Sequence, residues 1–308
     1  MVLLPWAREG LWRLRLLPAP AQGIPRGRGE GPAPVRAPSE GRGDVNERFR
    51  PGPRIGTAVT APTTVSAVRG EGFLLNELYV TLQGESSLVG LPTVFVRLYA
   101  CNLRCVWCDS MHAVEGGEFE RVSVDEVVER IQSLAGPSVG SHGGIRNVCW
   151  TGGEPLLQGE SIVRAIRRLP TTFVHSIETD GEVDLRTFDT LVRVERAEGR
   201  VRYVMDVKCP GSRMTARRAY ANLALLREVD EVKFVLLDRA DYEFAKEVLV
   251  RNETRAGTVL FSPVNPAHRV AQGLDPRELA DWILKDRLAV RLQPQMHKLL
   301  WPGKARGI

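Results

Sequence analysis

The sequence predicts an α/β protein whose core is a partial or modified (β/α) barrel. From Phe73 onward, apolar β-branched runs of about five residues alternate with amphipathic stretches of about ten. That alternation is typical of strand–helix units that build a mostly parallel sheet. Six or seven such units suit a βα barrel better than a doubly wound nucleotide-binding sheet. In addition, no Gly-x-Gly-x-x-Gly motif follows the first predicted strand, Val94–Leu98.

The predicted elements follow one another in a regular order. After the first strand, Ser123 is placed to cap a helix that extends to Leu134, with Val127 and Ile131 at helical spacing. The last predicted helix, Pro276–Asp286, has its proline near the start, where proline is tolerated. The remaining strands are predicted at 147–151, 173–177, 201–207, 232–237, 258–262 and 288–292, and the remaining helices at 161–169, 185–194, 217–229 and 241–252.

Residues 1–70 differ in composition from the rest of the 308-residue chain. They contain 11 Arg, no Lys and five acidic residues, with 10 of the 20 Pro and 10 of the 29 Gly. Residues 71–308 contain 31 basic and 32 acidic residues, so the net charge of +5 belongs to the leader. A low-complexity segment of this kind buries too little apolar surface to offset its ordering entropy. We therefore expect a disordered leader over 1–70 and one folded domain over 71–308.

The origin of the leader is open. It lacks the h-region and cleavage site of a secretory signal. An Arg-rich transit peptide, a nucleic-acid-binding arm and a mis-assigned start, with the true start near Val68, are the alternatives. The near-neutral folded part predicts no direct contact with nucleic acid. No run approaches the roughly 18 apolar residues of a membrane span, so no membrane association is predicted.

Three of the five cysteines lie in the segment Cys101-x3-Cys105-x2-Cys108. Thiols this close can share one metal centre but cannot all pair as disulfides. The odd number of cysteines indicates a reducing compartment, and hence the cytoplasm. A structural zinc site needs four ligands, and His112 is a candidate for the fourth. A [4Fe–4S] cluster normally takes four thiolates, so three would leave one iron open to another ligand.

The triplet, with Trp107 before its last cysteine, resembles the cluster-binding motif of the radical S-adenosylmethionine superfamily. Gly152-Gly153-Glu154-Pro155 resembles the superfamily segment that contacts the amino group of the cofactor. Both segments follow predicted strands, where βα barrels carry their chemistry. The resemblance implies a barrel of the radical SAM type, with a [4Fe–4S] cluster on Cys101, Cys105 and Cys108. It also implies S-adenosylmethionine on the open iron and a 5′-deoxyadenosyl radical as the reactive species.

Further segments narrow the resemblance to the 7-carboxy-7-deazaguanine synthase family, and it extends from about Glu77 to the C-terminus. This family contracts the ring of 6-carboxy-5,6,7,8-tetrahydropterin to form 7-carboxy-7-deazaguanine and ammonia, a step of queuosine biosynthesis. The resemblance implies a dependence on Mg²⁺, a homodimer and an external electron donor such as flavodoxin. The segments are Thr81–Glu85, Phe95–Arg97, Cys108–Ser110, Gln295–Trp301 and Arg306–Ile308.

The resemblance also implies roles for single residues. Ser110 would supply an oxygen to Mg²⁺, which prefers hard oxygen ligands. The planar guanidinium of Arg97 suits the carboxylate of the substrate. The expected cofactor contacts are Trp107, Cys108, Asp109, Gly153, Asp206, Val207, Lys208, Ser262, Pro263, Val264 and Asn265. The expected substrate contacts are Leu82, Gln83, Gly84, Arg97, Thr151, His297 and Ile308.

Five positions depart from the family pattern. Ser110 stands where many members have Thr, and its hydroxyl preserves the magnesium role. Ser86 stands where Gly is usual, Asp180 where Asn is common, and Asp206-Val207-Lys208 replaces a more typical Ser-Pro-Lys.

Two other functions compete with this one. A glycyl-radical-enzyme activase of the same superfamily shares the Cys-x3-Cys-x2-Cys spacing, although Arg97, Ser110 and the C-terminal segment do not favour it. A zinc-stabilised nucleic-acid-binding protein that uses the basic leader is the non-enzymatic alternative.

Overall fold

The computed structural model describes residues 72–137, 143–215, 218–265, 272–304 and 306–307. The predicted leader, 1–70, lies outside the described residues. The strands of the described part form one sheet. They are β1 (Gly72–Leu82), β2 (Pro92–Leu98), β3 (Glu120–Ser123), β4 (Asn147–Gly152), β5 (Val174–Thr179), β6 (Val201–Asp206), β7 (Glu231–Leu236), β8 (Thr258–Pro263) and β9 (Arg291–Leu292).

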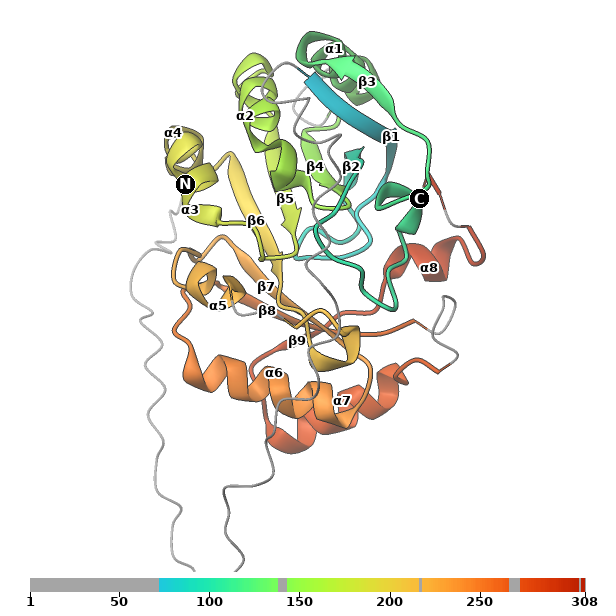
Figure 1. Cartoon of the computed structure of the whole chain (residues 1–308), viewed down its shortest axis with the longest axis vertical. Helices are drawn as coiled ribbons and strands as arrows, with labels where there is room; N and C mark the ends of the chain where they lie inside the picture. The colour runs from blue at the N-terminus through green and yellow to red at the C-terminus, as the bar shows by residue number, and fades with distance from the viewer. Residues whose placement is uncertain (1–71, 138–142, 216–217, 266–271, 305, 308) are drawn as a thin grey trace, which may run out of the picture. The chain divides into compact units, whose positions relative to one another are not determined.

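The sheet has the order β3-β1-β2-β4-β5-β6-β7-β8-β9. All neighbouring pairs from β2 to β9 are parallel, whereas β1 runs antiparallel to both β2 and β3. Within the described residues, β3 and β9 are the two edges, so the sheet curves without closing (Figure 1). The prediction of an α/β fold with a partial barrel is therefore confirmed.

The helices α1 to α7 lie along the outside of the curved sheet, and α8 lies beside the loop that joins β1 to β2 (Figure 1). Ser123 caps α1 as predicted, since its Oγ accepts a hydrogen bond from the amide of Glu126 at 3.1 Å. No helix in the described ranges is long and apolar enough to cross a membrane. The helices are α1 (Val124–Ala135), α2 (Gly159–Arg168), α3 (Leu185–Leu191), α4 (Arg193–Ala197), α5 (Arg218–Leu223), α6 (Arg239–Arg251), α7 (Pro276–Asp286) and α8 (Met296–Leu300).

The core lies between the sheet and these helices. Trp150 on β4, Tyr203 on β6 and Phe234 on β7 are completely shielded from solvent. Phe73 on β1 stacks on Trp150, with ring centroids 5.7 Å apart. Burying an apolar side chain of this size stabilises the fold by about 1.5–3 kcal/mol. Since side chains alternate along a strand, this packing also fixes which side chains point away from the core.

Several elements differ from the prediction. The sequence did not predict β1, β3 or α8. The predicted helix over 185–194 is two helices that meet at Val192, whose ψ of 19° is not helical. The predicted helix over 217–229 is only α5, and the predicted strand over 288–292 is only β9.

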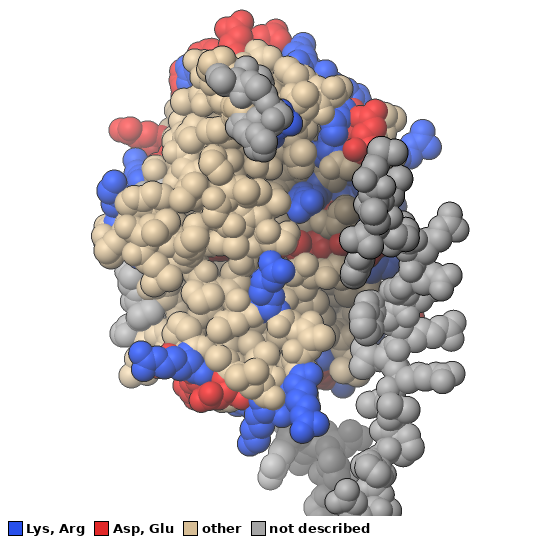
Figure 2. All heavy atoms as spheres, turned by 180° about the vertical axis from the view of Figure 1, so that it is seen from behind, with Lys and Arg blue, Asp and Glu red and all other residues tan. Residues whose placement is uncertain are grey.

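Charged side chains are mixed on the face opposite to that of Figure 1. Figure 2 shows Lys and Arg at several separate places on that face, with Asp and Glu between them. This mixture agrees with the near-neutral charge of residues 71–308.

Candidate active site

The loops that leave the carboxyl ends of the parallel strands surround a deep cavity. The space between these loops, including open solvent at the mouth, is about 1410 Å³. The predicted site residues that line it are Leu82, Gln83, Gly84, Arg97, Cys101, Cys105, Trp107, Cys108, Asp109, Ser110, Thr151, Gly153, Asp206, Lys208, Ser262, Pro263, Val264, Asn265 and His297.

The three cysteines of the triplet all face this cavity from the loop that follows β2. Cys101 is 8% exposed, and its sulfur accepts a hydrogen bond from the amide of Leu103 at 3.3 Å. The amide of Cys108 donates to the carbonyl of Cys105 at 3.2 Å, which turns the loop between them. Burial raises the pKa of all three thiols, so binding iron would displace their protons. Three soft sulfur donors on one short loop fit a [4Fe–4S] cluster.

The arrangement of these thiols differs from that of a zinc site. Across the described ranges, no three His, Cys, Asp or Glu side chains converge as the ligands of a single metal ion would. A cubane cluster does not need such convergence, because each thiolate binds a different iron. His112, the candidate fourth zinc ligand, faces Glu77, with its Nε2 3.3 Å from a carboxylate oxygen.

Gly152 and Gly153 let the end of β4 pack against the start of the cysteine loop. Gly152 has a φ of +134°, and a Cβ on it would collide with the backbone of Leu98. A Cβ on Gly153 would collide with the carbonyl oxygen of Ala100. The backbone of Gly153 therefore lines the cavity with no side chain over it, as a close approach by the amino group of S-adenosylmethionine requires.

Glu154 joins the loops that follow β4 and β5. Its fully buried carboxylate accepts hydrogen bonds from the amide of Leu156 at 2.9 Å, the hydroxyl of Thr179 at 3.0 Å and the amide of Asp180 at 2.7 Å. Burial, and then the charge of Asp180, raise the pKa of Glu154. Oδ2 of Asp180 lies 3.9 Å from the sulfur of Cys101. Glu154 is therefore a structural link beneath the cysteine loop.

Two buried polar atoms on the cofactor side of the cavity have no hydrogen-bond partner among the described residues. They are Oδ1 of Asp206 and Oγ of Ser262, and both residues line the cavity. The other oxygen of Asp206, Oδ2, lies 2.8 Å from Nζ of Lys208. An unpaired buried polar atom costs about 1–3 kcal/mol. These atoms therefore suit a ligand that brings hydrogen-bonding groups, as the ribose hydroxyls of S-adenosylmethionine would.

Val207 differs from its predicted role. Its side chain is 1% exposed, belongs to the hydrophobic core and does not line the cavity. Side chains alternate along an extended segment, so Asp206 and Lys208 face the cavity while Val207 faces the core. Only the backbone of Val207 is left for a cofactor contact, and its amide already donates to the carbonyl of Lys233 at 2.8 Å.

On the substrate side, Glu178 holds two predicted substrate contacts. Its carboxylate accepts a hydrogen bond from Nε2 of Gln83 at 3.2 Å and another from the hydroxyl of Thr151 at 2.8 Å. Gln83 is 2% exposed, and its Oε1 accepts from the amide of Glu85 at 3.1 Å. The two side chains are therefore locked in one orientation at the cavity wall.

Arg97 lines the cavity with its guanidinium already engaged on one edge. Nε lies 3.0 Å from a carboxylate oxygen of Glu77, and Nη2 donates to the hydroxyl of Tyr79 at 2.8 Å. Burial opposes the charge of Arg97, but Tyr79 and then Glu77 outweigh it and raise the pKa of Arg97. A substrate carboxylate would meet the edge that carries Nη1, and the Nε–Nη2 fork is occupied by protein.

The C-terminal segment forms the remaining wall. The amide of Met296 donates to the carbonyl of Gly84 at 3.0 Å, and a Cβ on Gly84 would collide with the ring of His297. Burial lowers the pKa of His297, which is therefore neutral at pH 7. Ser110 also faces the cavity, with its Oγ 3.9 Å from the sulfur of Cys108. The predicted contact by Ile308 lies outside the described residues.

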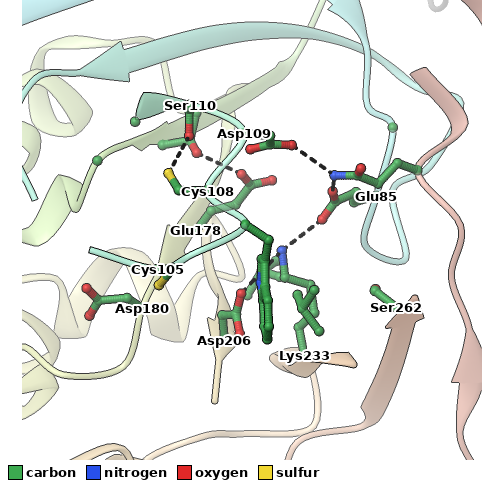
Figure 3. A pocket seen from close by; sticks show the side chains of 18 of the residues that line it. Glu85, Cys105, Cys108, Asp109, Ser110, Glu178, Asp180, Asp206, Lys233 and Ser262 are labelled. Atoms are coloured by element: carbon green, nitrogen blue, oxygen red, sulfur yellow. Dashed lines mark hydrogen bonds and ion pairs between the residues drawn. The ribbon is translucent and has the colours of Figure 1, made fainter. Parts of the chain in front are cut away.

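Six polar or charged residues that line the cavity were not among the predicted site residues: Glu85, Glu178, Thr179, Asp180, Lys233 and Gln295. Glu85 and Gln295 belong to the segments that carry the family resemblance, so their positions in those segments were an available signal. For Lys233, the available signal was a lone charge within an apolar strand. Figure 3 shows Lys233 pointing toward Glu85, and Glu85 linked through an amide side chain to Asp109.

An open barrel with a three-cysteine loop at its carboxyl rim is the arrangement of a radical S-adenosylmethionine enzyme. Residues 96–228 match the model of the Radical SAM superfamily. The chain is 40% identical over 246 residues to the 7-carboxy-7-deazaguanine synthase of Koribacter versatilis, which covers 76% of this chain and 99% of that protein. It is 34% identical over 238 residues to the same enzyme of Chlorobaculum tepidum, covering 76% and 96%. The chain therefore belongs to the 7-carboxy-7-deazaguanine synthase family.

The fold agrees with a solved structure that carries the short name of this enzyme. The crystal structure of QueE from Escherichia coli superimposes with a TM-score of 0.52 at 21% sequence identity. The match covers 73% of this chain and 95% of that one. At this identity the likeness supports the fold.

Proposed function

We propose that this protein converts 6-carboxy-5,6,7,8-tetrahydropterin to 7-carboxy-7-deazaguanine and ammonia, as a radical carbon–nitrogen lyase of queuosine biosynthesis. The observation that carries the proposal is the convergence of the family's functional positions on one cavity, because all of them except Val207 and Ile308 line it. Relatives of the same name also match along nearly their whole length, such as 99% of the Koribacter versatilis enzyme.

The cofactor side holds the groups that generate the radical. A bound [4Fe–4S] cluster and S-adenosylmethionine would supply the 5′-deoxyadenosyl radical chemistry that removes a hydrogen atom from C6 of the pterin. Cys101, Cys105 and Cys108 would hold the cluster. Trp107, Asp109, Gly153, Asp206, Lys208 and the segment 262–265 would hold S-adenosylmethionine. Apolar residues of the wall, which include Phe95, Leu103, Val114, Val204 and Val235, exclude water from the reactive species.

The substrate side fixes the orientation of the pterin. Gln83 and Thr151, both anchored on Glu178, present hydrogen-bonding groups to the alternating donors and acceptors of a pterin edge. Arg97 attracts the substrate carboxylate, and Ser110 offers an oxygen to Mg²⁺ beside it. Leu82, Gly84, His297 and the C-terminal carboxylate of Ile308 complete the proposed contacts.

Three further features belong to this proposal. We propose a homodimer, an external one-electron donor such as flavodoxin, and a cytoplasmic location. The location is supported by the five cysteines, all of which are free thiols. Exposed apolar side chains on the β1–β2 hairpin and α8, among them Val80, Leu91 and Leu299, support association with a second copy.

Anaerobic reconstitution with iron and sulfide tests the function. We expect a brown protein with about four irons per chain that uses S-adenosylmethionine to turn the carboxytetrahydropterin into a deazaguanine. Cys105→Ala should lose both the cluster and turnover, because it removes a proposed ligand. Cys149→Ala is the matched control for the cluster, because Cys149 lies on β4, does not line the cavity and should leave the iron content unchanged.

Other results would point to the competing functions. Colourless protein that holds zinc would overturn the enzyme, and turnover by the Cys105→Ala variant would refute ligation by Cys105. A cluster-loaded protein that cleaves S-adenosylmethionine only in the presence of a protein substrate would be an activase.

A further inference from the structure

An upper tier of polar side chains, Glu85, Lys233 and Gln295, holds the loop between β1 and β2. The carboxylate of Glu85 lies 2.8 Å from Nζ of Lys233 and accepts from Nε2 of Gln295 at 2.6 Å. Burial opposes ionisation of Glu85, but the Lys233 ammonium and the hydrogen bonds from Lys233 and Gln295 outweigh it and lower the pKa of Glu85. The loop therefore carries a buried negative charge that depends on Lys233.

A lower tier, Ser86, Ser87, Glu231 and Gln293, holds the next two residues of the same loop. The amide of Ser86 donates to Oε1 of Gln293 at 2.6 Å, and Nε2 of Gln293 donates back to the carbonyl of Ser86 at 3.0 Å. The amide of Ser87 donates to the carboxylate of Glu231 at 2.9 Å. Glu231 precedes Lys233 by two residues on β7, so both side chains point to the same face.

Unlike the lower tier, the upper tier contacts residues that are proposed to bind the cofactor. Lys233 pairs with Asp206 across β7 and β6, and its Nζ lies 3.8 Å from Oδ2 of that aspartate. Gln295 donates to Oδ2 of Asp109 at 3.2 Å. Asp109 and Asp206 are proposed cofactor contacts. Glu85 directly follows Gln83 and Gly84, which are proposed substrate contacts.

Four charged side chains of this region form a chain of ion pairs, and Glu178 acts on Lys233 as a further acid. Glu85 and Asp206 are negative, and Lys208 and Lys233 are positive, with Lys233 lying between the two acids. In a buried site such charges attract one another strongly, so a change at one acid alters the attraction at the other. A ligand can change these ion pairs by binding to Oδ1 of Asp206, because that atom has no partner in the described residues and Asp206 lines the cavity.

We infer that Lys233 is a positioning residue that couples S-adenosylmethionine binding to the conformation of the loop between β1 and β2. This loop carries the proposed substrate contacts Gln83 and Gly84. The inference rests on the proposed function. A hydrogen bond from the cofactor to Asp206 weakens the attraction between the Asp206 carboxylate and the Lys233 ammonium. The ammonium is then attracted more strongly to Glu85, whose amide orients Gln83 through a 3.1 Å hydrogen bond. Binding free energies are reciprocal. If the cofactor tightens substrate binding by a given factor, the substrate must therefore tighten cofactor binding by the same factor.

Equilibrium binding to the cluster-loaded protein tests this coupling. Without a reductant neither ligand reacts, so calorimetry gives the Kd of S-adenosylmethionine with and without saturating carboxytetrahydropterin. We expect the pterin to tighten cofactor binding by roughly tenfold in the natural protein, within the usual 5- to 150-fold range. Lys233→Met should reduce that factor to below about twofold, and Lys233→Arg should restore most of it, because the charge is retained.

A purely structural role would give a different result. It would lower the melting temperature and weaken both ligands without changing the ratio of the two Kd values, and that outcome would overturn the inference. If Lys233→Met does not fold, Glu85→Gln removes the other end of the pair and should abolish the coupling equally.

Hydrogen–deuterium exchange separates this inference from the proposed function, because it needs only S-adenosylmethionine. The cofactor alone should slow exchange at the amide of Glu85, which donates to Gln83, in the natural protein but not in Lys233→Met. Failure of the carboxytetrahydropterin to bind would overturn the proposed function, and this exchange result would still decide the coupling. Equal slowing in both proteins would contradict the role of Lys233.

Discussion

Two buried aspartates at opposite ends of the sheet are satisfied in different ways. Asp230 lies just before β7, at the end away from the cavity. Its carboxylate accepts from both terminal nitrogens of Arg196 at 2.9 Å, from the amide of Tyr203 at 2.9 Å and from the amide of Arg227 at 2.8 Å. Nε of Arg196 pairs in turn with Asp189 at 2.7 Å. Protein groups alone complete this site.

Asp206, at the end of β6, has protein partners among the described residues for only one of its two carboxylate oxygens. Oδ2 faces Lys208 and Lys233, while Oδ1 has no partner among the described residues although it is buried. A complete set of partners indicates a structural role, and an incomplete set at a cavity indicates a ligand. Burial alone does not distinguish the two, because Asp230 is 0% exposed and Asp206 is 8% exposed.

Removing the partner of the satisfied aspartate should have the largest effect. Arg196→Met leaves Asp230 charged and buried without its main partner, which costs about 3–5 kcal/mol. We expect the unfolding free energy, measured with urea, to fall by that amount. The affinity of the folded protein for S-adenosylmethionine should not change, because Arg196 lies at the far end of the sheet from the cavity.

Arg251→Met is the matched control for that variant. Arg251 pairs with Glu247 on the surface of α6, with side chains 74% and 50% exposed, and such exposed pairs contribute about 0–1 kcal/mol. Equal losses in the two variants would show that the partners of Asp230 contribute no more than a surface pair.

Asp206→Ser should have the opposite profile. The family resemblance implies serine at this position, so we expect the protein to fold and its unfolding free energy to change by less than in Arg196→Met. A hydrogen bond to a charged group contributes about 1.5–3 kcal/mol. We therefore expect affinity for S-adenosylmethionine, measured by calorimetry, to fall by about 10- to 100-fold. Unchanged affinity would mean that Oδ1 of Asp206 does not contact the cofactor.

The residues on the cofactor side of the site were largely predictable from the sequence. The contacts of Lys233 and Gln295 with Glu85, which hold the loop between β1 and β2, were not. The three cysteines lie within eight residues, and Gly152–Gly153 end a strand, so both signals are local. The contact between Glu85 and Lys233 joins residues 148 positions apart. In the sheet, β4, β5 and β6 lie between β2 and β7, so the curvature of the sheet (Figure 1) brings those two residues together, and neither periodicity nor spacing contains that information.

The missed strand β1 has a similar physical reason. A register shift between Leu75 and Glu77 interrupts its pairing with β2, so its apolar residues do not alternate regularly. It also runs antiparallel to β2, outside the βα repeat on which the prediction was based. The helix α8 has only five residues, too few to show helical periodicity.

His175 shows where an unpaired buried atom is no sign of a ligand. Its Nε2 has no partner in the described residues, but it lies in the core, and Nδ1 accepts from the indole of Trp150 at 3.2 Å. Burial, and then the charge of Arg200, lower the pKa of His175 to about 3. Below pH 6.5 the unfolded chain takes up a proton that the folded protein does not.

The unfolding free energy should therefore be unaffected by His175 above pH 6.5 and should fall as the pH decreases toward 3. The expected slope is up to about 1.4 kcal/mol per pH unit, or about 2 kcal/mol at pH 5. His175→Gln is the comparison, because its amide can accept from Trp150 without titrating. Urea unfolding of both proteins across this range measures the difference, and parallel pH profiles would refute the assignment to His175.

The smallest effect is expected at Ser86, in the lower tier, which like Asp230 is satisfied by protein groups. Ser86 has a φ of +64°, which explains why Gly is usual here and costs a side chain about 1 kcal/mol. Its Oγ offsets that strain by accepting from the amide of Leu88 at 3.0 Å. Ser86→Gly should therefore stay within about 1 kcal/mol of the natural protein, since it loses both terms. Ser86→Ala keeps the strain and loses the hydrogen bond, so its unfolding free energy should be lower by about 1 kcal/mol. If Ala and Gly prove equal, the left-handed backbone carries no strain, and the two hydrogen bonds with Gln293 alone determine the conformation of the loop.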